Sequence, residues 1–258
     1  MAPHITEIVF KLNKGDVLIA RTDFCTFPAT AKKLPSVGGY LNLNMEYLVG
    51  LQPNLILDFP NSRYRAKLEE LGFSVVEVPN ETIEEILASI LKVGRTLGAE
   101  ARAEMVVRGI RDTLKMVEKV LPEGKRPAAM LVVGRQPGSL EGLTVAGPQT
   151  YLSEIWEICG GKNAFPAAPV RYFTPSAEAL FHSTVDAILE FFPDGPVTRP
   201  EAQFVWKDYS HLNAVKKKAI WEFHDSAFLI PGPRISKVAL TFQQIVEDCL
   251  KKYPDAGK

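Results

Sequence analysis

The sequence predicts an α/β protein that is built as two lobes, each around a largely parallel sheet. Short apolar runs of strand length alternate with segments of helical period along the 258 residues, the pattern of strands connected by helices. Hydrophobic residues make up 46% of the chain and charged residues 23%, which supplies a core and excludes a disordered chain or a small disulfide scaffold. The predicted strands are Val17–Ala20, Asn54–Phe59, Phe73–Val78, Ala128–Gly134, Ala187–Phe191, Ala202–Trp206 and Ala227–Ile230.

A single long helix is predicted between the two lobes. Helical segments cover Ser62–Leu71 and Tyr151–Cys159, and a further helix opens at Glu81. The next one runs from about Ala99 to Leu121, well beyond the ~11–12 residues of a typical helix. We therefore divide the chain into an N-terminal α/β lobe (1–98), a connecting helix (99–121) and a C-terminal α/β lobe (122–258).

An internal repeat supports two similarly built lobes. Asn44–Phe59 aligns without a gap over Ser176–Phe191 at a constant offset of 132 residues. Asn44 and Ser176 are favourable N-cap residues, each starting a helix that leads into an apolar strand. From the residues alone, a glutamate in the first turn is explained by the helix dipole. The identical pairs are Glu46/Glu178, Leu48/Leu180, Ile56/Ile188, Leu57/Leu189 and Phe59/Phe191.

Charge and motif content argue against several classes of function. Lys and Arg total 30, as do Asp and Glu, so the basic excess of a nucleic-acid binder is absent. The chain contains no phosphate-binding loop, dinucleotide fingerprint, nucleophile elbow or HExxH zinc motif. Its four histidines are scattered, with no two at metal-ligand spacing on one helix face. We therefore predict no enzyme, no catalytic residue, no metal site and no resident cofactor.

The beginning of the chain carries no export signal. No basic segment followed by an apolar one precedes Ala2-Pro3-His4, and no apolar run approaches the ~20 residues of a membrane span. Taken literally, this indicates a cytosolic protein.

Aromatic residues gather at the predicted ends of strands. Phe24 precedes Cys25, Tyr40 follows two glycines, Phe59 closes a strand, and Tyr172 precedes the Ser176 helix. Ligands of open α/β sheets sit outside the carboxyl ends of the strands. These rings therefore suit a bulky, mostly apolar ligand, with packing between loops and sheet as the alternative.

Ordered motifs along nearly the whole chain resemble the substrate-binding proteins of cobalamin and ferric-siderophore ABC importers, the class III or helical-backbone periplasmic binding proteins. The resemblance implies two Rossmann-like lobes joined by one long helix, with the ligand between them. The motifs are Thr22-Asp-Phe-Cys-Thr-Phe-Pro28, Val37-Gly-Gly-Tyr40, Met45–Leu57, Leu152–Phe165, Asn213–Lys216 and Pro231-Gly-Pro-Arg234.

The resemblance also assigns roles to single residues. It implies that Glu46 and Glu178 dock onto the membrane permease, and that Cys159 and Cys249 form a disulfide. Cys25 is left in the cleft loop, as a packing residue or a soft contact to ligand. The other implied ligand contacts are Phe24, Tyr40, Phe59, Tyr172 and Asp225.

The expected protein is a monomeric, non-catalytic receptor that hands cobalamin, or a similar large iron chelate, to an importer permease and its ATPase. Such a protein is periplasmic or anchored outside the cell by a lipid. The family pattern has a signal and a first strand before Ala2-Pro3, so we expect a shortened chain. Two rivals stay open: a haem carrier with Tyr40 as axial ligand, and a cytosolic α/β enzyme or sensor on the same scaffold.

Overall fold

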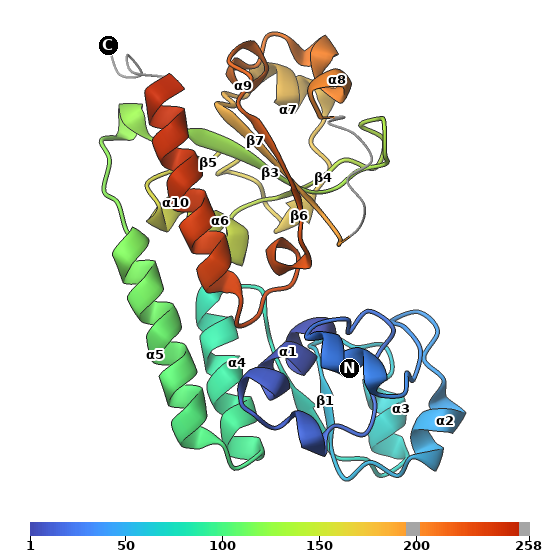
Figure 1. The fold of residues 1–258 in the computed structure, drawn as a ribbon. Helices are drawn as coiled ribbons and strands as arrows, with labels where there is room; N and C mark the ends of the chain where they lie inside the picture. The colour runs from blue at the N-terminus through green and yellow to red at the C-terminus, as the bar shows by residue number, and fades with distance from the viewer. Residues whose placement is uncertain (195–201, 253–258) are drawn as a thin grey trace. The chain divides into compact units, whose positions relative to one another are not determined.

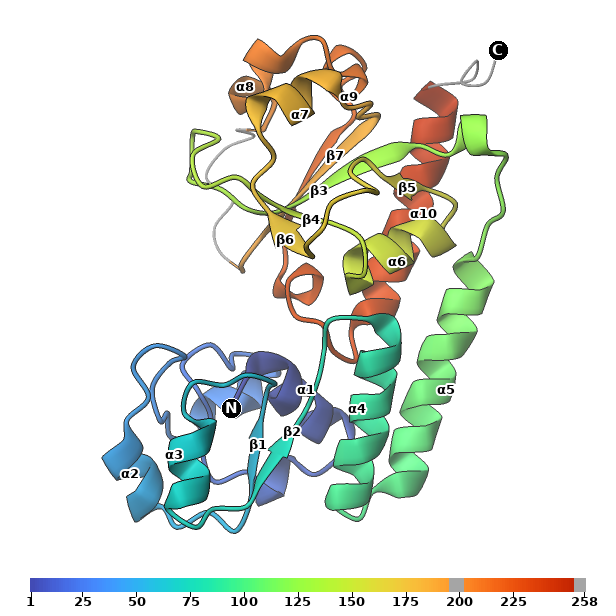
Figure 2. The ribbon, with the colours of Figure 1, turned by 180° about the vertical axis from the view of Figure 1, so that it is seen from behind.

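The computed structural model describes residues 1–194 and 202–252, which form two compact units. Unit 1 comprises Met1–Arg111 and Ile230–Pro233, and unit 2 comprises Asp112–Leu229 and Arg234–Lys258. The division falls inside helix α5 (Glu100–Val117). Figures 1 and 2 show both units from opposite sides.

Unit 1 contains a short parallel sheet, in which β1 (Ile56–Asp58) pairs with β2 (Val75–Glu77). Ile56 joins a buried cluster with Val37, Leu48 and Leu68. The helices of this unit, besides the first part of α5, are α1 (Pro3–Lys11), α2 (Met45–Gly50), α3 (Arg65–Glu70) and α4 (Ile83–Thr96), with 3-10 turns η1 (Gly15–Val17) and η2 (Ala29–Lys33).

Helices α1 and α4 are fixed to the end of β2 by polar contacts. The Nε2 atom of His4 lies 3.1 Å from the carbonyl oxygen of Val78. The hydroxyl of Ser89 donates to the carbonyl of Pro79 at 2.6 Å. At the start of α4, the side chain of Thr82 and the side chain of Glu85 each accept from the other's backbone N–H, which satisfies donors that a helix start otherwise leaves unpaired.

Unit 2 is built on a sheet in which the described strands follow the order β6-β4-β3-β7-β8, with β5 also paired to β3. β3 pairs in parallel with β5 and β7, and β7 in parallel with β8. β4 runs antiparallel to β3 and to β6. The bounds are β3 (Ala128–Gly134), β4 (Thr144–Ala146), β5 (Lys162–Asn163), β6 (Tyr172–Phe173), β7 (Ala187–Phe192) and β8 (Ile220–His224).

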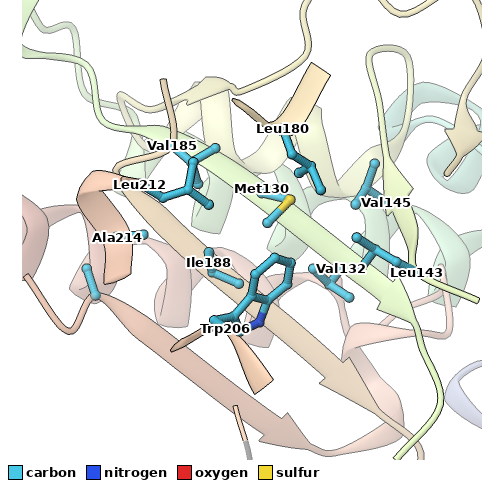
Figure 3. Packing of buried hydrophobic residues seen from close by; sticks show 11 residues of the cluster. Met130, Val132, Leu143, Val145, Leu180, Val185, Ile188, Trp206, Leu212 and Ala214 are labelled. Atoms are coloured by element: carbon cyan, nitrogen blue, oxygen red, sulfur yellow. The ribbon is translucent and has the colours of Figure 1, made fainter. Parts of the chain in front are cut away.

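Helices cover both faces of this sheet. On one face, Met130 and Ile188 pack with Trp206 and with Leu180 of α7 (Figure 3). On the other face, Phe191 contacts Phe242 of α10, which in turn meets α6. The elements are α6 (Tyr151–Ile158), α7 (Ala177–His182), α8 (Ala202–Val205), α9 (Asn213–Lys216) and α10 (Ile235–Lys252), with 3-10 turns η3 (Glu123–Lys125), η4 (Lys207–Tyr209) and η5 (Ser226–Phe228).

The α/β class is confirmed, whereas three predicted strands are wrong. Ala202–Trp206 contains α8, and Ala227–Ile230 overlaps η5, where the Asp225 side chain accepts from the Ala227 N–H and caps a helical turn. Val17–Ala20 forms no strand among the described residues, and the nearest pairing is an isolated bridge between Arg21 and Ser36. The predicted long helix ends at Val117 rather than Leu121.

Candidate functional site

Unit 1 presents an aromatic patch formed by Phe24, Tyr40 and Phe59. Phe24 is 66% exposed and Tyr40 is 49% exposed. The rings of Tyr40 and Phe59 lie 5.3 Å apart between centroids. A β-carbon placed on Gly39 would lie 3.3 Å from the Phe24 ring, so Phe24 packs beside the residue that precedes Tyr40. The structure therefore brings these three predicted ligand contacts together.

A tight turn holds the patch in place. The Asp23 N–H donates to the carbonyl of Gly38 at 3.0 Å, and the Gly39 N–H donates to Oδ1 of Asn42 at 3.0 Å. Gly38 has a φ of +93°, and a β-carbon there would lie 2.3 Å from the Asn42 carbonyl. Only glycine fits this conformation, and the turn in turn fixes the position of Tyr40.

Cys25 lies inside unit 1 rather than on the aromatic patch. It is 1% exposed, and its sulfur lies 3.1 Å from the hydroxyl of Thr22. This position supports the packing role for Cys25.

In unit 2, Tyr172 is 39% exposed on β6, whereas the carboxylate of Asp225 is engaged within its own unit. It accepts from the Ala227 N–H at 2.8 Å and pairs with Arg234 at 3.4 Å and with Lys237. Burial alone would raise the pKa of Asp225, but the Lys237 and Ala227 hydrogen bonds and the nearby cations hold its pKa below the ordinary value. Asp225 therefore organises this loop, and its contact with a ligand stays a prediction.

A buried ion pair was missed by the sequence reasoning. Arg135 donates to both carboxylate oxygens of Glu190, at 2.7 and 2.9 Å, and its guanidinium lies 5.1 Å from the ring centre of Phe192. The indole N–H of Trp206 donates to the same carboxylate at 3.0 Å. The Arg135 side chain is 1% exposed and that of Glu190 is 0% exposed. The sequence does contain a signal for this pair, because Glu190 is a charged residue within the apolar run of β7.

The two repeated glutamates occupy matching local positions. Asn44 accepts from the Tyr47 N–H at 2.9 Å, and Ser176 accepts from the Ala179 N–H at 3.0 Å. These caps place Glu46 and Glu178 in the first turns of α2 and α7. Both residues are exposed. Neither carboxylate has an ion-pair partner within the described part of the chain. Both are available to an external cation.

The predicted disulfide is wrong, because the thiols of Cys159 and Cys249 are free and buried. The Cys159 sulfur lies 3.5 Å from the carbonyl of Ala239 on α10. Cys249 lies ten residues farther along α10, which is about 15 Å of helical rise, beyond the Cα separation of about 4.4–6.8 Å that a disulfide requires. Burial raises the pKa of each thiol to about 12.

Residues 1–194 and 202–252 contain no group of three His, Cys, Asp or Glu side chains arranged to hold a metal. Over the same ranges no helix has the length and apolarity of a membrane span.

Comparison with known families gives the assignment. The family model described as "Periplasmic binding protein" matches residues 1–227. The chain belongs to this family. The resemblance inferred from the sequence is thereby confirmed.

Curated relatives of this periplasmic binding protein match over most of their length. It is 26% identical to the uncharacterized ABC transporter substrate-binding lipoprotein YvrC of Bacillus subtilis (strain 168), over 100% of this chain and 80% of the relative. It is also 26% identical to the vitamin B12-binding protein of Vibrio vulnificus (strain YJ016), over 96% of this chain and 87% of that protein.

Solved structures share the fold at lower identity. The periplasmic vitamin B12-binding protein BtuF of Vibrio cholerae has a TM-score of 0.79 and 22% identity, covering 97% of this chain and 96% of that one. The periplasmic heme-binding protein BhuT, in complex with two hemes, has a TM-score of 0.80 and 22% identity, covering 96% of this chain and 97% of that one.

Proposed function

We propose that this protein is the non-catalytic substrate-binding component of an ABC importer, which captures cobalamin or a similar large iron-chelate ligand. The observation that carries the proposal is the aromatic patch, where the largely exposed Phe24 ring and the Tyr40–Phe59 pair present apolar surface. Rings that are exposed together mark a surface for a partner or ligand. The vitamin B12-binding and heme-binding relatives support a corrinoid or porphyrin as that ligand.

The remaining assignments extend this proposal through the family resemblance. Tyr172 and Asp225 of unit 2 contact the ligand. Glu46 and Glu178 dock the loaded protein onto the permease, which works with its ATPase. The protein acts in the periplasm or at the outer face of the membrane through a lipid anchor, as the lipoprotein relative supports.

A thermal-shift panel tests the ligand. The protein is heated with cyanocobalamin, cobinamide, haem and several ferric siderophores. At about 100 times its dissociation constant, the true ligand adds ~2.7 kcal/mol to the free energy of unfolding. No shift from any of these compounds would contradict the proposal.

The aromatic patch is tested by substitution. Phe24→Ala is expected to weaken binding of the responding ligand by about 1–3 kcal/mol, since a stacked ring loses its buried area. The same change leaves the unfolding temperature of the free protein almost unaltered, because the ring is exposed. Phe204→Ala is the matched control, since Phe204 is 65% exposed in unit 2. Equal weakening by both variants would remove the patch from the ligand site.

A haem-binding function is the second candidate, and the position of Tyr40 favours it. The Tyr40 side chain is about half exposed, and its hydroxyl makes no hydrogen bond to any residue in the described ranges. A phenolate on ferric iron gives a charge-transfer band in the visible spectrum. If haem binds with this band and Tyr40→Phe removes it, while cyanocobalamin gives no thermal shift, the haem function replaces the cobalamin function.

A further inference from the structure

Helices α2 and α7 each expose an apolar side chain one turn after the repeated glutamate. Val49 follows Glu46 by three residues and is 38% exposed, and Phe181 follows Glu178 by three residues and is 65% exposed. These two apolar residues also correspond to each other in the internal repeat, because they stand at the same offset of 132 residues. The repeat therefore extends to the exposed faces of the two helices.

Helix geometry places each apolar side chain beside its glutamate. Residues three apart on a helix are neighbours on one face. The leucine that lies between them in the sequence, Leu48 in α2 and Leu180 in α7, is buried in the core of its unit, and Figure 3 shows this for Leu180. Each helix therefore presents a carboxylate and an apolar side chain together, on the side away from its core.

The ring of Phe181 is held in a defined position by two histidine rings. Its centroid lies 5.3 Å from that of His182 and 5.0 Å from that of His211. The Nε2 atom of His211 in turn lies 3.4 Å from the carbonyl oxygen of Leu180. A ring that is already ordered in the free protein loses little side-chain entropy in a complex. Phe181 is therefore prepared for contact with a partner.

The combination of charge and apolar surface specifies the chemistry of that partner. A single exposed apolar side chain is ordinary on a protein surface. Here the same pair of a glutamate and an apolar neighbour recurs on two helices that lie 132 residues apart in the sequence. A surface that satisfies both members of the pair presents a cation with an apolar pocket beside it.

We propose that Val49 and Phe181 are apolar anchors of the surface that docks onto the importer permease, which rests on the docking role proposed above for Glu46 and Glu178. The permease then has an apolar pocket beside each cation that meets a glutamate. The pocket for Phe181 accommodates an aromatic ring, whereas the pocket for Val49 is smaller. This difference makes the two docking points non-equivalent and favours one orientation of the protein on the permease.

The charges and the anchors contribute to different steps of docking. Complementary charges raise the association rate and make it depend on salt concentration. Apolar anchors are buried only in the formed complex, so their loss acts mainly on the dissociation rate. The two contributions can therefore be measured separately.

The test uses the full chain and each permease–ATPase complex of this importer class from its source organism, held in lipid nanodiscs on a sensor surface. We expect Phe181→Ala to weaken binding by about 10- to 100-fold and Val49→Ala by about three- to tenfold, both through faster dissociation. The salt dependence of association and the unfolding temperature should remain those of wild type, because both side chains are exposed and uncharged. Phe181→Leu should retain most of the affinity. Phe204→Ala, which removes an equally exposed ring from unit 2, should bind as wild type.

The outcomes separate this proposal from the docking role on which it rests. Wild-type affinity of Phe181→Ala and Val49→Ala, together with slowed association of the double variant Glu46→Ala, Glu178→Ala, would overturn the anchors alone. Equal weakening by Phe204→Ala, or weakening by Phe181→Ala through slower association only, would also overturn them. Binding that none of these changes affects, or no binding of the wild-type chain to any complex, would overturn the docking role as well.

Discussion

The burial of His4 makes the stability of the protein depend on pH. Burial lowers the pKa of its imidazole from 6.5 to about 4, against a smaller opposing effect of the Val78 carbonyl. Because the folded pKa lies below the unfolded pKa, this contribution to stability is complete above pH 6.5 and is lost as pH falls toward 4. The loss amounts to about 3 kcal/mol at most. We expect His4→Gln to flatten the decline in urea midpoint between pH 7 and 4, whereas His182→Gln, at an exposed position, leaves it unchanged. An identical decline in wild type and His4→Gln would refute this account.

The Arg135–Glu190 pair is a second residue-scale feature with a clear consequence. Removing one partner leaves the other charge buried and uncompensated, which typically costs about 3–5 kcal/mol. We therefore expect Arg135→Met to lower the free energy of unfolding by that amount in urea titrations. Lys67→Met, which breaks the exposed pair of Lys67 with Glu70, should cost less than about 1 kcal/mol. Comparable losses in the two variants would show that the buried pair has no special weight.

For helices and strands, prediction from the sequence was correct where an apolar run was long. It was wrong where contacts with distant parts of the chain decide the local structure. The bounds of β3 agree with the predicted strand Ala128–Gly134. Ala202–Trp206 was predicted as a strand because a short apolar run does not distinguish a strand from a buried helical turn. β8 was missed, since its residues are only partly buried and include Glu222 and His224.

Some features of the candidate site could likewise be predicted from the sequence, and others could not. The exposed aromatic patch and the two glutamates follow motifs that the sequence displays directly. The engagement of Asp225 with Lys237 and the pairing of Arg135 with Glu190 were not predicted, because the partners lie 12 and 55 residues apart. Separation in sequence does not determine which side chains meet.

Helices α2 and α7 carry the element-scale prediction. The double variant Glu46→Ala, Glu178→Ala should retain full ligand binding and lose uptake in cells, because docking charges act only at the permease. Glu104→Ala on α5 is the control, since Glu104 is also exposed and lies outside the repeat. Normal uptake by the double variant would show that these carboxylates do not dock.

For the whole molecule, the three free cysteines make stability independent of reducing agent. We expect dithiothreitol to leave the unfolding temperature unchanged. The native protein should react slowly with a thiol reagent, whereas the unfolded chain should expose three thiols. The physical reason is burial, which raises the pKa of Cys159 and Cys249 to about 12 and suppresses the reactive thiolate. A fall in unfolding temperature with dithiothreitol would instead show that the protein contains a stabilising disulfide.

The short length of α2 and α7, six residues each, has a consequence for the orientation of Glu46 and Glu178, the proposed docking residues. A helix of six residues does not hold its shape by itself in water. Leu48 and Leu180, which are 5% and 3% exposed, anchor these two helices to their units and so orient Glu46 and Glu178 from beneath. Under the proposed docking role, delivery of the ligand is therefore sensitive to substitutions in the interior, where the loss of a methyl group can reorient a surface carboxylate that has itself not changed.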